Sequence, residues 1–235
     1  MKDQYVGDIN DYLKYALLRR LAGRDFSVAT VWMLTAPDGR QDGRRLGYLA
    51  QPEKYRPLDP PLFDSLRELV RRGRREVQAV EREEIIPNAT YVSDVLRDDL
   101  LTRHNYFQRV WEIAESRNLI FFDPDNGFCV ESVQKGRRNS AKYLYWEELS
   151  DAFSRDHSVV AYQHFPRRAR SEYIGEIADR VRGVTGSRQI LAVSTSHVAF
   201  FVIPQPAAVK ALSERLRAFS TRISLPRRQM VSIGF

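Results

Sequence analysis

Two acidic side chains separated by one residue follow a short apolar run in the middle of the chain. The run is Leu119–Phe122, and residues 123–127 after it read D-P-D-N-G. Four consecutive apolar residues are too few for a helix but are typical of a strand that is buried on both faces. Proline cannot continue a strand ladder, so the backbone must turn outward after Asp123. Ligands bind at the carboxyl ends of strands in open α/β sheets, which makes Asp123, Asp125 and Asn126 candidate catalytic residues. The alternative is a plain turn, because D-P and N-G are common turn dipeptides.

A second polar strand end is expected at His164. The segment 158–163 has the composition of a strand, and it continues into His164 within the sequence Y-Q-H-F-P-R. If this strand lies beside the strand that ends at Asp123, the carboxylate and the imidazole share one cleft. An imidazole in such a place can act as an acid, a base or a ligand, although a hydrogen-bonded structural histidine is the alternative.

The elements that must position these side chains alternate along the chain. Periodicity and end signals predict helices over 8–22, 60–72, 97–117, 146–155, 170–182 and 206–219, and strands over 27–34, 76–81, 89–93, 119–122, 158–163, 189–194, 197–203 and 229–235. Such alternation predicts an α/β fold in one domain, 1–235, with a mostly parallel, Rossmann-like sheet and helices on both faces. The connection before residue 197 is too short for a parallel crossover, which predicts a late antiparallel hairpin at the sheet edge. Residues 35–60 are expected to form a long loop.

Composition excludes several classes of protein. The chain has 235 residues, of which 43% are hydrophobic and 29% charged, as in an ordinary globular protein. Its apolar runs are far shorter than the roughly 20 residues that span a bilayer, so no membrane partner is expected. The first residues lack the apolar region of a secretory signal, and the single cysteine excludes an internal disulfide. A cytoplasmic location is therefore expected.

The balance of charge points to nucleic acid as a partner. The formal net charge is +7 and the isoelectric point is about 9.6, and phosphate neutralisation requires a surplus of basic side chains. The alternative is a solvated basic surface. The candidate nucleic-acid contacts lie in clusters near expected loops, at Lys135, Arg137, Arg138, Lys142 and Arg167.

Three short segments resemble a known family. The order of elements is similar to the Rossmann-like fold of S-adenosylmethionine-dependent methyltransferases. Residues 7–15, G-D-I-N-D-Y-L-K-Y, resemble the N-terminal G-N-x-x-D-x-L-K-H segment of the bacterial 23S ribosomal RNA adenine-N6 methyltransferases. The D-P-D-N segment stands at the place of their D-P-P-Y motif, and F-V-I-P-Q-P at 201–206 is similar to their late F-V-I-N-P-P segment. The chain also resembles a group of uncharacterised bacterial proteins with F-D-P-D-N-G and Y-Q-H segments.

The resemblance implies a divergent base N-methyltransferase that uses S-adenosylmethionine. Asp123 would accept a hydrogen bond from the exocyclic amine of a flipped base. Glu81 would bind the cofactor ribose and Asp94 its adenine, while Asp38 lies in the turn after the first strand, where the family has its glycine-rich cofactor turn. The remaining residues implied at the cofactor edge and the substrate entrance are Gly7, Asp8, Asp11 and Lys14.

Two other functions stay open at this point. Asp125 adds a negative charge beside Asp123, which a methyl acceptor does not need but a divalent cation does. A metal-dependent phosphodiesterase or nuclease would use Asp123, Asp125 and Glu131 as ligands of Mg²⁺ or Mn²⁺. The third possibility is a non-catalytic protein that binds nucleic acid or a nucleotide on the same sheet.

Overall fold

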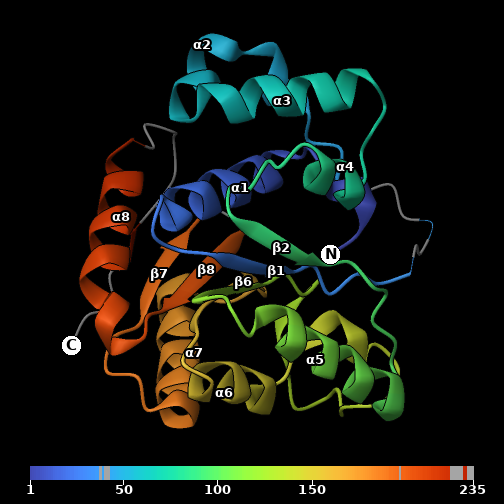
Figure 1. Cartoon of the computed structure of the whole chain (residues 1–235), viewed down its shortest axis with the longest axis vertical. Helices are drawn as coiled ribbons and strands as arrows, with labels where there is room; N and C mark the ends of the chain where they lie inside the picture. Colours follow the sequence, from blue (N-terminus) through green and yellow to red (C-terminus); the bar gives the residue numbers. More distant parts are fainter. Residues whose placement is uncertain (37–38, 40–42, 196, 223–229, 232–235) are drawn as a thin grey trace.

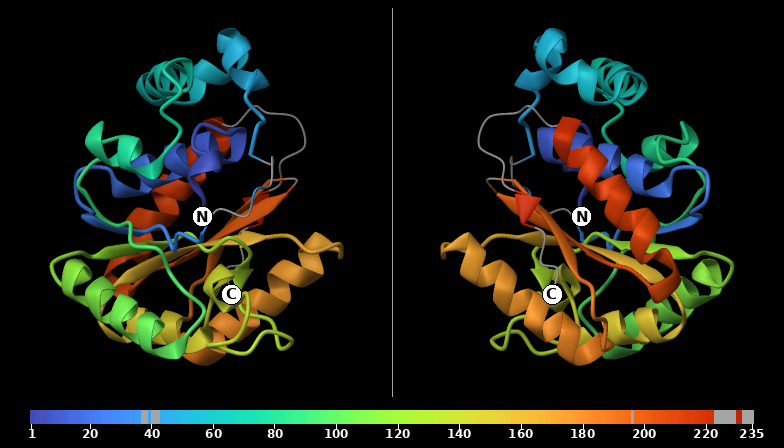
Figure 2. Two further views of the ribbon diagram at one scale, coloured as in Figure 1. Left: turned by 90° about the vertical axis from the view of Figure 1, so that its right-hand side faces the viewer. Right: turned by 90° about the vertical axis from the view of Figure 1, so that its left-hand side faces the viewer.

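A seven-stranded sheet with helices on both faces forms the centre of the protein. The computed structural model describes residues 1–36, 39, 43–195, 197–222 and 230–231. The strand order is β2-β1-β3-β6-β8-β7-β9, and helices cover both faces of the sheet (Figures 1 and 2). The strands are β1 (Val28–Val31), β2 (Ala89–Val92), β3 (Leu119–Phe122), β6 (Ser158–His164), β7 (Leu191–Ser194), β8 (Val198–Ile203) and β9 (Met230–Val231).

The sheet is parallel from β2 to β6 and antiparallel beyond. β1 pairs in parallel with β2 and β3, and β3 pairs in parallel with β6. β8 runs antiparallel to both β6 and β7, and it lies between them. This arrangement confirms the Rossmann-like α/β fold and its late antiparallel hairpin.

The buried strand β3 separates two hydrophobic clusters. Leu119 and Phe121 point into one cluster, whereas Ile120 and Phe122 point into the other, and all four side chains are fully buried. Side chains alternate across a strand, so a strand covered by helices on both sides needs apolar residues at every position. Burial of one such side chain stabilises the fold by about 1.5–3 kcal/mol.

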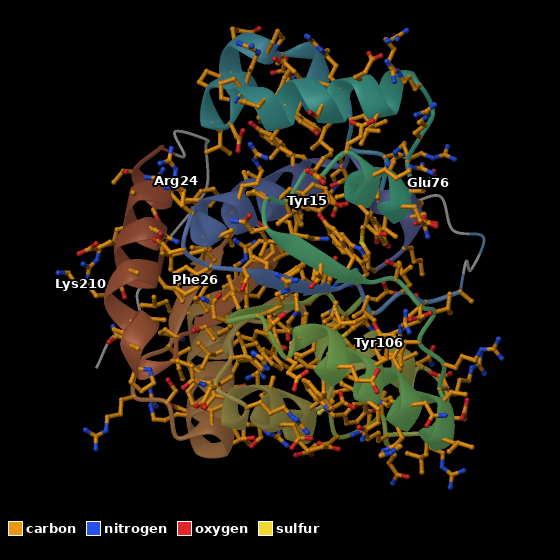
Figure 3. The ribbon with its side chains drawn as sticks, in the orientation of Figure 1. Tyr15, Arg24, Phe26, Glu76, Tyr106 and Lys210 are labelled. Carbon is orange, nitrogen blue, oxygen red and sulfur yellow. The ribbon has the colours of Figure 1, made fainter. Side chains whose placement is uncertain are left out.

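The helices divide between the two faces. On one face lie α1 (Ile9–Ala22), α3 (Pro60–Arg71), α4 (Val77–Arg82) and α8 (Val209–Arg222), and on the other α5 (Leu100–Ala114), α6 (Trp146–Ser154) and α7 (Arg170–Thr185). Tyr15 and Tyr106 mark the interior of the two layers in Figure 3, while Lys210 points outward from α8. None of the helices in the described part of the chain combines the length and apolar character that a bilayer-spanning segment requires.

Helix α1 is buried on nearly all sides because it lies between the sheet and α3 (Figure 1). The carboxylate of Asp8 begins the helix by accepting a hydrogen bond from the backbone N–H of Asn10 at 2.9 Å. Gly23 ends it with φ of 53°. This position makes the polar side chains of α1 part of the interior.

Two of the expected elements differ in the structure. The strand expected over 76–81 is wrong, because these residues begin α4. Val77 and Ala79 alternate as in a strand, but Val77 and Val80 lie one helical turn apart and both pack into the core. The expected loop 35–60 contains three short helical segments: Gly47–Ala50, α2 (Pro52–Tyr55) and Arg56–Leu58. Tyr48 fixes the first of them by stacking on Tyr12, with ring centroids 5.2 Å apart.

Candidate functional site

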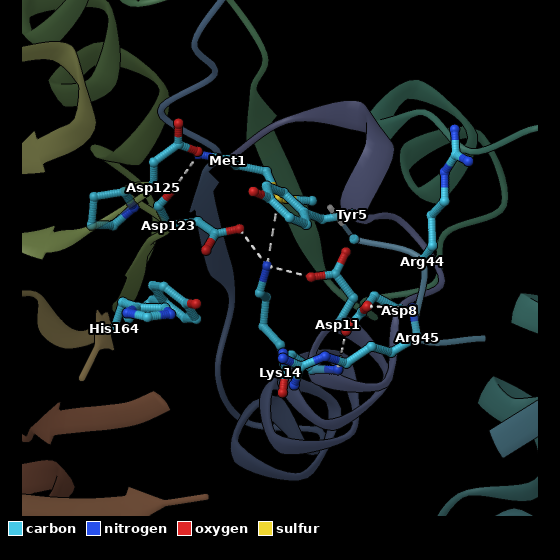
Figure 4. A pocket seen from close by; sticks show the side chains of 14 residues that line it. Met1, Tyr5, Asp8, Asp11, Lys14, Arg44, Arg45, Asp123, Asp125 and His164 are labelled. Carbon is cyan, nitrogen blue, oxygen red and sulfur yellow. Dashed lines mark hydrogen bonds and ion pairs between the residues drawn. The ribbon is translucent and has the colours of Figure 1, made fainter. Parts of the chain in front are cut away.

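A cavity of about 440 Å³ opens at the carboxyl ends of β3 and β6. Its walls come from residues within 1–14, 43–45, 123–125 and 162–164, four stretches that are distant in the sequence (Figure 4). Six of the residues expected at a site line it: Asp8, Asp11, Lys14, Asp123, Asp125 and His164. The expectation that the Asp123 and His164 strand ends share one cleft is therefore confirmed. Their catalytic roles stay predictions.

A buried lysine joins two carboxylates at the floor of this cavity. Lys14 Nζ lies 2.8 Å from Asp11 Oδ1 and 2.6 Å from Asp123 Oδ2. The three side chains are each at most 4% exposed. Tyr15 donates a further hydrogen bond to Asp11 Oδ2 at 3.0 Å, and the ring of Tyr162 lies 5.6 Å from Lys14 Nζ. Both oxygens of Asp11 are thus engaged.

Burial changes the acidity of this group. Desolvation and the nearby charge of Asp123 raise the pKa of Asp11 to about 6, although Lys14 opposes the shift. Burial lowers the pKa of Lys14, but the two carboxylates outweigh this effect and hold that pKa above its ordinary value. A carboxyl group with a pKa near 6 can both accept and release a proton close to neutral pH.

The turn after β3 is held against β6 by a glutamine. Gln163 Oε1 accepts a hydrogen bond from the backbone N–H of Phe128 at 2.7 Å, and its Nε2 donates to the carbonyl of Asn126 at 3.1 Å. Gly127 has φ of 109°, and a Cβ atom there would overlap the Gln163 side chain. The glycine of D-P-D-N-G is therefore required for this close approach, while the Asn126 side chain does not line the cavity.

Asp125 is engaged by cations of its own chain. Its Oδ1 lies 2.6 Å from the amine of Met1, and its Oδ2 accepts a hydrogen bond from Thr35 at 2.6 Å. Lys2 Nζ lies 3.7 Å away. Burial raises the pKa of Asp125, but the Met1 amine and Thr35 outweigh it and bring that pKa below its ordinary value.

The metal ligands expected from the sequence do not fit a metal site. Among the residues that the structure describes, no group of three His, Cys, Asp or Glu side chains converges as a metal ion requires. Asp123 forms an ion pair with Lys14, and Asp125 forms an ion pair with the amine of Met1. Glu131 is exposed and lies outside the cavity. The described side chains at this site therefore offer no set of ligands for Mg²⁺ or Mn²⁺.

Three of the residues implied for the cofactor do not line the cavity, whereas Asp8, Asp11 and Lys14 do. Glu81 lies on α4, not at a strand end, and accepts hydrogen bonds from Trp32 Nε1 at 2.9 Å and from Ser93. Asp94 is 57% exposed and pairs with Arg109 at 2.9 Å. Neither lines the cavity, and Gly7, beside Asp8, does not line it either. Asp38 lies outside the described residues.

The expected nucleic-acid contacts are also divided. Lys135 is held by Glu147 and Glu148, at 2.9 Å from each. Arg167 lines a second cavity of about 600 Å³ next to His164. The other three, Arg137, Arg138 and Lys142, line neither cavity.

Sequence reasoning missed several residues that line the first cavity, four of them with aromatic or cationic side chains. Tyr5, Arg44, Arg45 and Tyr162 contribute aromatic and cationic side chains to it. The adjacent arginines at 44 and 45 gave the one usable signal, a basic pair within the expected loop. The rest depend on the path of the folded chain.

The fold and the cavity define a Rossmann-like α/β protein with a lysine–carboxylate network at the carboxyl edge of its sheet. A comparison with protein-family models finds no match to this chain, and a comparison with curated proteins finds no related sequence.

Proposed function

We propose that the cavity binds one nucleotide unit of a nucleic acid. The observation that supports this function is a carboxylate floor below a cationic mouth. Of the two carboxylate oxygens of Asp123, Lys14 binds only Oδ2. The other oxygen, Oδ1, lies on the side of His164 (Figure 4). A carboxylate oxygen without a partner accepts hydrogen bonds from amino or hydroxyl groups, which bases and riboses supply.

The mouth of the cavity offers the charge that a phosphate needs. The guanidinium of Arg45 makes no hydrogen bond or ion pair with any described residue, and Arg44 and His164 line the same opening. The ring of Tyr162 at the wall is half-buried and could stack on a base. The net charge of +7 favours a polyanionic partner.

Binding of a labelled single-stranded oligonucleotide, followed by fluorescence anisotropy, tests this function. We expect Asp123→Asn to weaken binding about tenfold, which corresponds to the loss of one charge-assisted hydrogen bond of about 1.4 kcal/mol. The asparagine oxygen still accepts from Lys14, so the fold should persist, and circular dichroism checks this. We also expect the affinity to fall as salt rises, because phosphate contacts release counterions.

Asp94→Asn is the matched control. It removes the same charge from an exposed carboxylate outside the cavity, and it should leave affinity unchanged or slightly higher, since the protein becomes more basic. Equal affinities of Asp123→Asn and the wild type, or binding that does not respond to salt, would refute the proposed function.

Methyl transfer from S-adenosylmethionine is the second candidate. It is supported by the convergence of Asp8, Asp11, Lys14 and Asp123, the residues on which the family resemblance depends, around one cavity. Glu81 and Asp94 do not line the cavity, so the cofactor would have to enter this same cavity without contacts from either residue. Under this proposal, calorimetric titration with S-adenosylmethionine gives a saturable heat. Absence of heat removes the candidate.

A further inference from the structure

Two cavities meet at His164. The first contains the Asp123 floor, and the second is lined by residues 164–170 and by His197. His164 ends β6 and pairs across the sheet with Val198, which follows His197 in the chain. The two imidazoles therefore lie on neighbouring strand ends, at the junction between the cavities.

Cationic side chains gather at this junction without matching acids. No hydrogen bond or ion pair joins the guanidinium of Arg45 or of Arg167 to another described side chain. The guanidinium of Arg170 lies 5.8 Å from the ring of Phe165, a contact that leaves its charge unpaired. Arg168 differs, because Glu176 binds it through two hydrogen bonds, one of them 2.9 Å long.

The nearby carboxylate of Asp8 is already occupied. Its Oδ1 accepts from the backbone N–H of Asn10 and its Oδ2 from the backbone N–H of Arg45, both at 2.9 Å. It therefore fixes the backbone of the loop that carries Arg45, rather than forming a salt bridge with the guanidinium.

The charges at the junction repel one another. Burial lowers the pKa of His197, and Arg45, His164 and Arg170 lower it further, while Asp8 opposes them. Like charges held close together cost free energy unless an anion lies between them. These cationic side chains therefore destabilise one another when no anion is bound, and a bound phosphate relieves this repulsion.

We infer that Arg45, His164, His197 and Arg170 form a phosphate subsite at the junction of the two cavities. The inference rests on the proposed function and specifies its substrate class, a nucleotide or strand end with a terminal phosphate. Two guanidinium and two imidazole groups can neutralise the two charges of a phosphate monoester, whereas an internal phosphodiester has one charge. The base of the same nucleotide would reach Asp123.

The histidine resonances report on this subsite directly. The chain has four histidines, and His→Gln variants assign their imidazole carbon–proton signals in an NMR titration. With inorganic phosphate as the probe, we expect the titration midpoints of His164 and His197 to rise, because a bound anion favours the imidazolium form. The exposed His104 on α5 serves as the internal control and should not respond.

A pair of oligonucleotides tests the terminal phosphate. An oligonucleotide with a 5′-phosphate should bind about tenfold more tightly than the same strand with a 5′-hydroxyl, as one charge-assisted contact predicts. Arg45→Gln should remove this difference. Arg188→Gln removes the same charge but should keep the difference in affinity. Arg188 is exposed just before β7, at the end of the sheet opposite to the cavities.

The results separate the subsite from the proposed function. Equal binding of the two strands, with the His164 and His197 signals unmoved by phosphate, overturns the subsite but leaves nucleic-acid binding at Asp123 standing. A response of both histidines to phosphate, with no binding of either strand, supports the phosphate site and overturns the nucleic-acid function. A response of His104 equal to that of His164 shows non-specific association and also overturns the subsite.

Discussion

Replacement of Lys14 by methionine is expected to lower the free energy of unfolding by about 3–5 kcal/mol at pH 8, because it leaves two buried carboxylates without their shared cation. Asp11 and Asp123 are only 3% and 2% exposed, so water replaces the lost partner only in part. Methionine keeps most of the volume of the lysine side chain, which limits the effect of cavity formation. Urea denaturation of the variant and the wild type measures the difference.

The same variant should respond to pH in a defined direction. The pKa of Asp11 is about 6, above its ordinary value of 3.8 because of burial, and Lys14 lowers it. Without Lys14 the pKa of Asp11 should rise further. The ionised Asp11 carboxylate then lowers the free energy of unfolding most at a pH above this pKa, and the loss becomes smaller as the pH falls below it. The pKa of Lys14 is itself raised, so Lys14 keeps its charge throughout this window. The penalty should therefore be smaller at pH 5 than at pH 8.

Lys210→Met is the control for this experiment. Lys210 lies on the exposed face of α8 (Figure 3) and should change stability by less than about 0.5 kcal/mol. A penalty for Lys14→Met that is equally small, or that grows as the pH falls from 8 to 5, would contradict the buried network.

The second large effect is expected at Arg103, on the other face of the sheet. Its guanidinium binds Glu148 at 2.6 and 2.7 Å and donates to the carbonyls of Ser140 and Tyr143. Arg103 is 1% exposed. Arg103→Met should cost about 3 kcal/mol, near the lower end for a broken buried pair, because Lys135 remains 2.9 Å from Glu148.

A matched substitution lies on the same helix. Arg109 also belongs to α5 and pairs with Asp94 at 2.9 Å, but both side chains are more than half exposed. Arg109→Met should cost at most about 1 kcal/mol. Thermal and urea unfolding compare the two variants, and equal penalties would show that burial does not govern the strength of these ion pairs. Glu148→Gln in the Arg103→Met background should restore part of the loss by removing the unpaired charge.

The local pattern of the sequence was sufficient for the sheet and for the edge that carries the site. Four apolar residues before Asp123 required a strand covered on both sides, and the short connection before His197 required an antiparallel pair. The same reasoning failed at 76–81, because spacing of Val77, Ala79 and Val80 suits either a strand or one helical turn, and packing against the core selects the helix.

The sequence by itself determined that Asp123 and His164 each end a strand, since alternation of elements and residue hydrophobicity are local properties. That these two strands are neighbours follows from the pairing of β3 with β6 in the folded sheet. Only the tertiary structure decided that Lys14 reaches Asp123 across 109 positions of the chain, that Asp94 faces solvent, and that Arg45 approaches His197. Contacts between residues that are far apart in the sequence depend on the order of strands and the path of loops. These follow from how the whole chain buries its apolar surface, and no short segment encodes them.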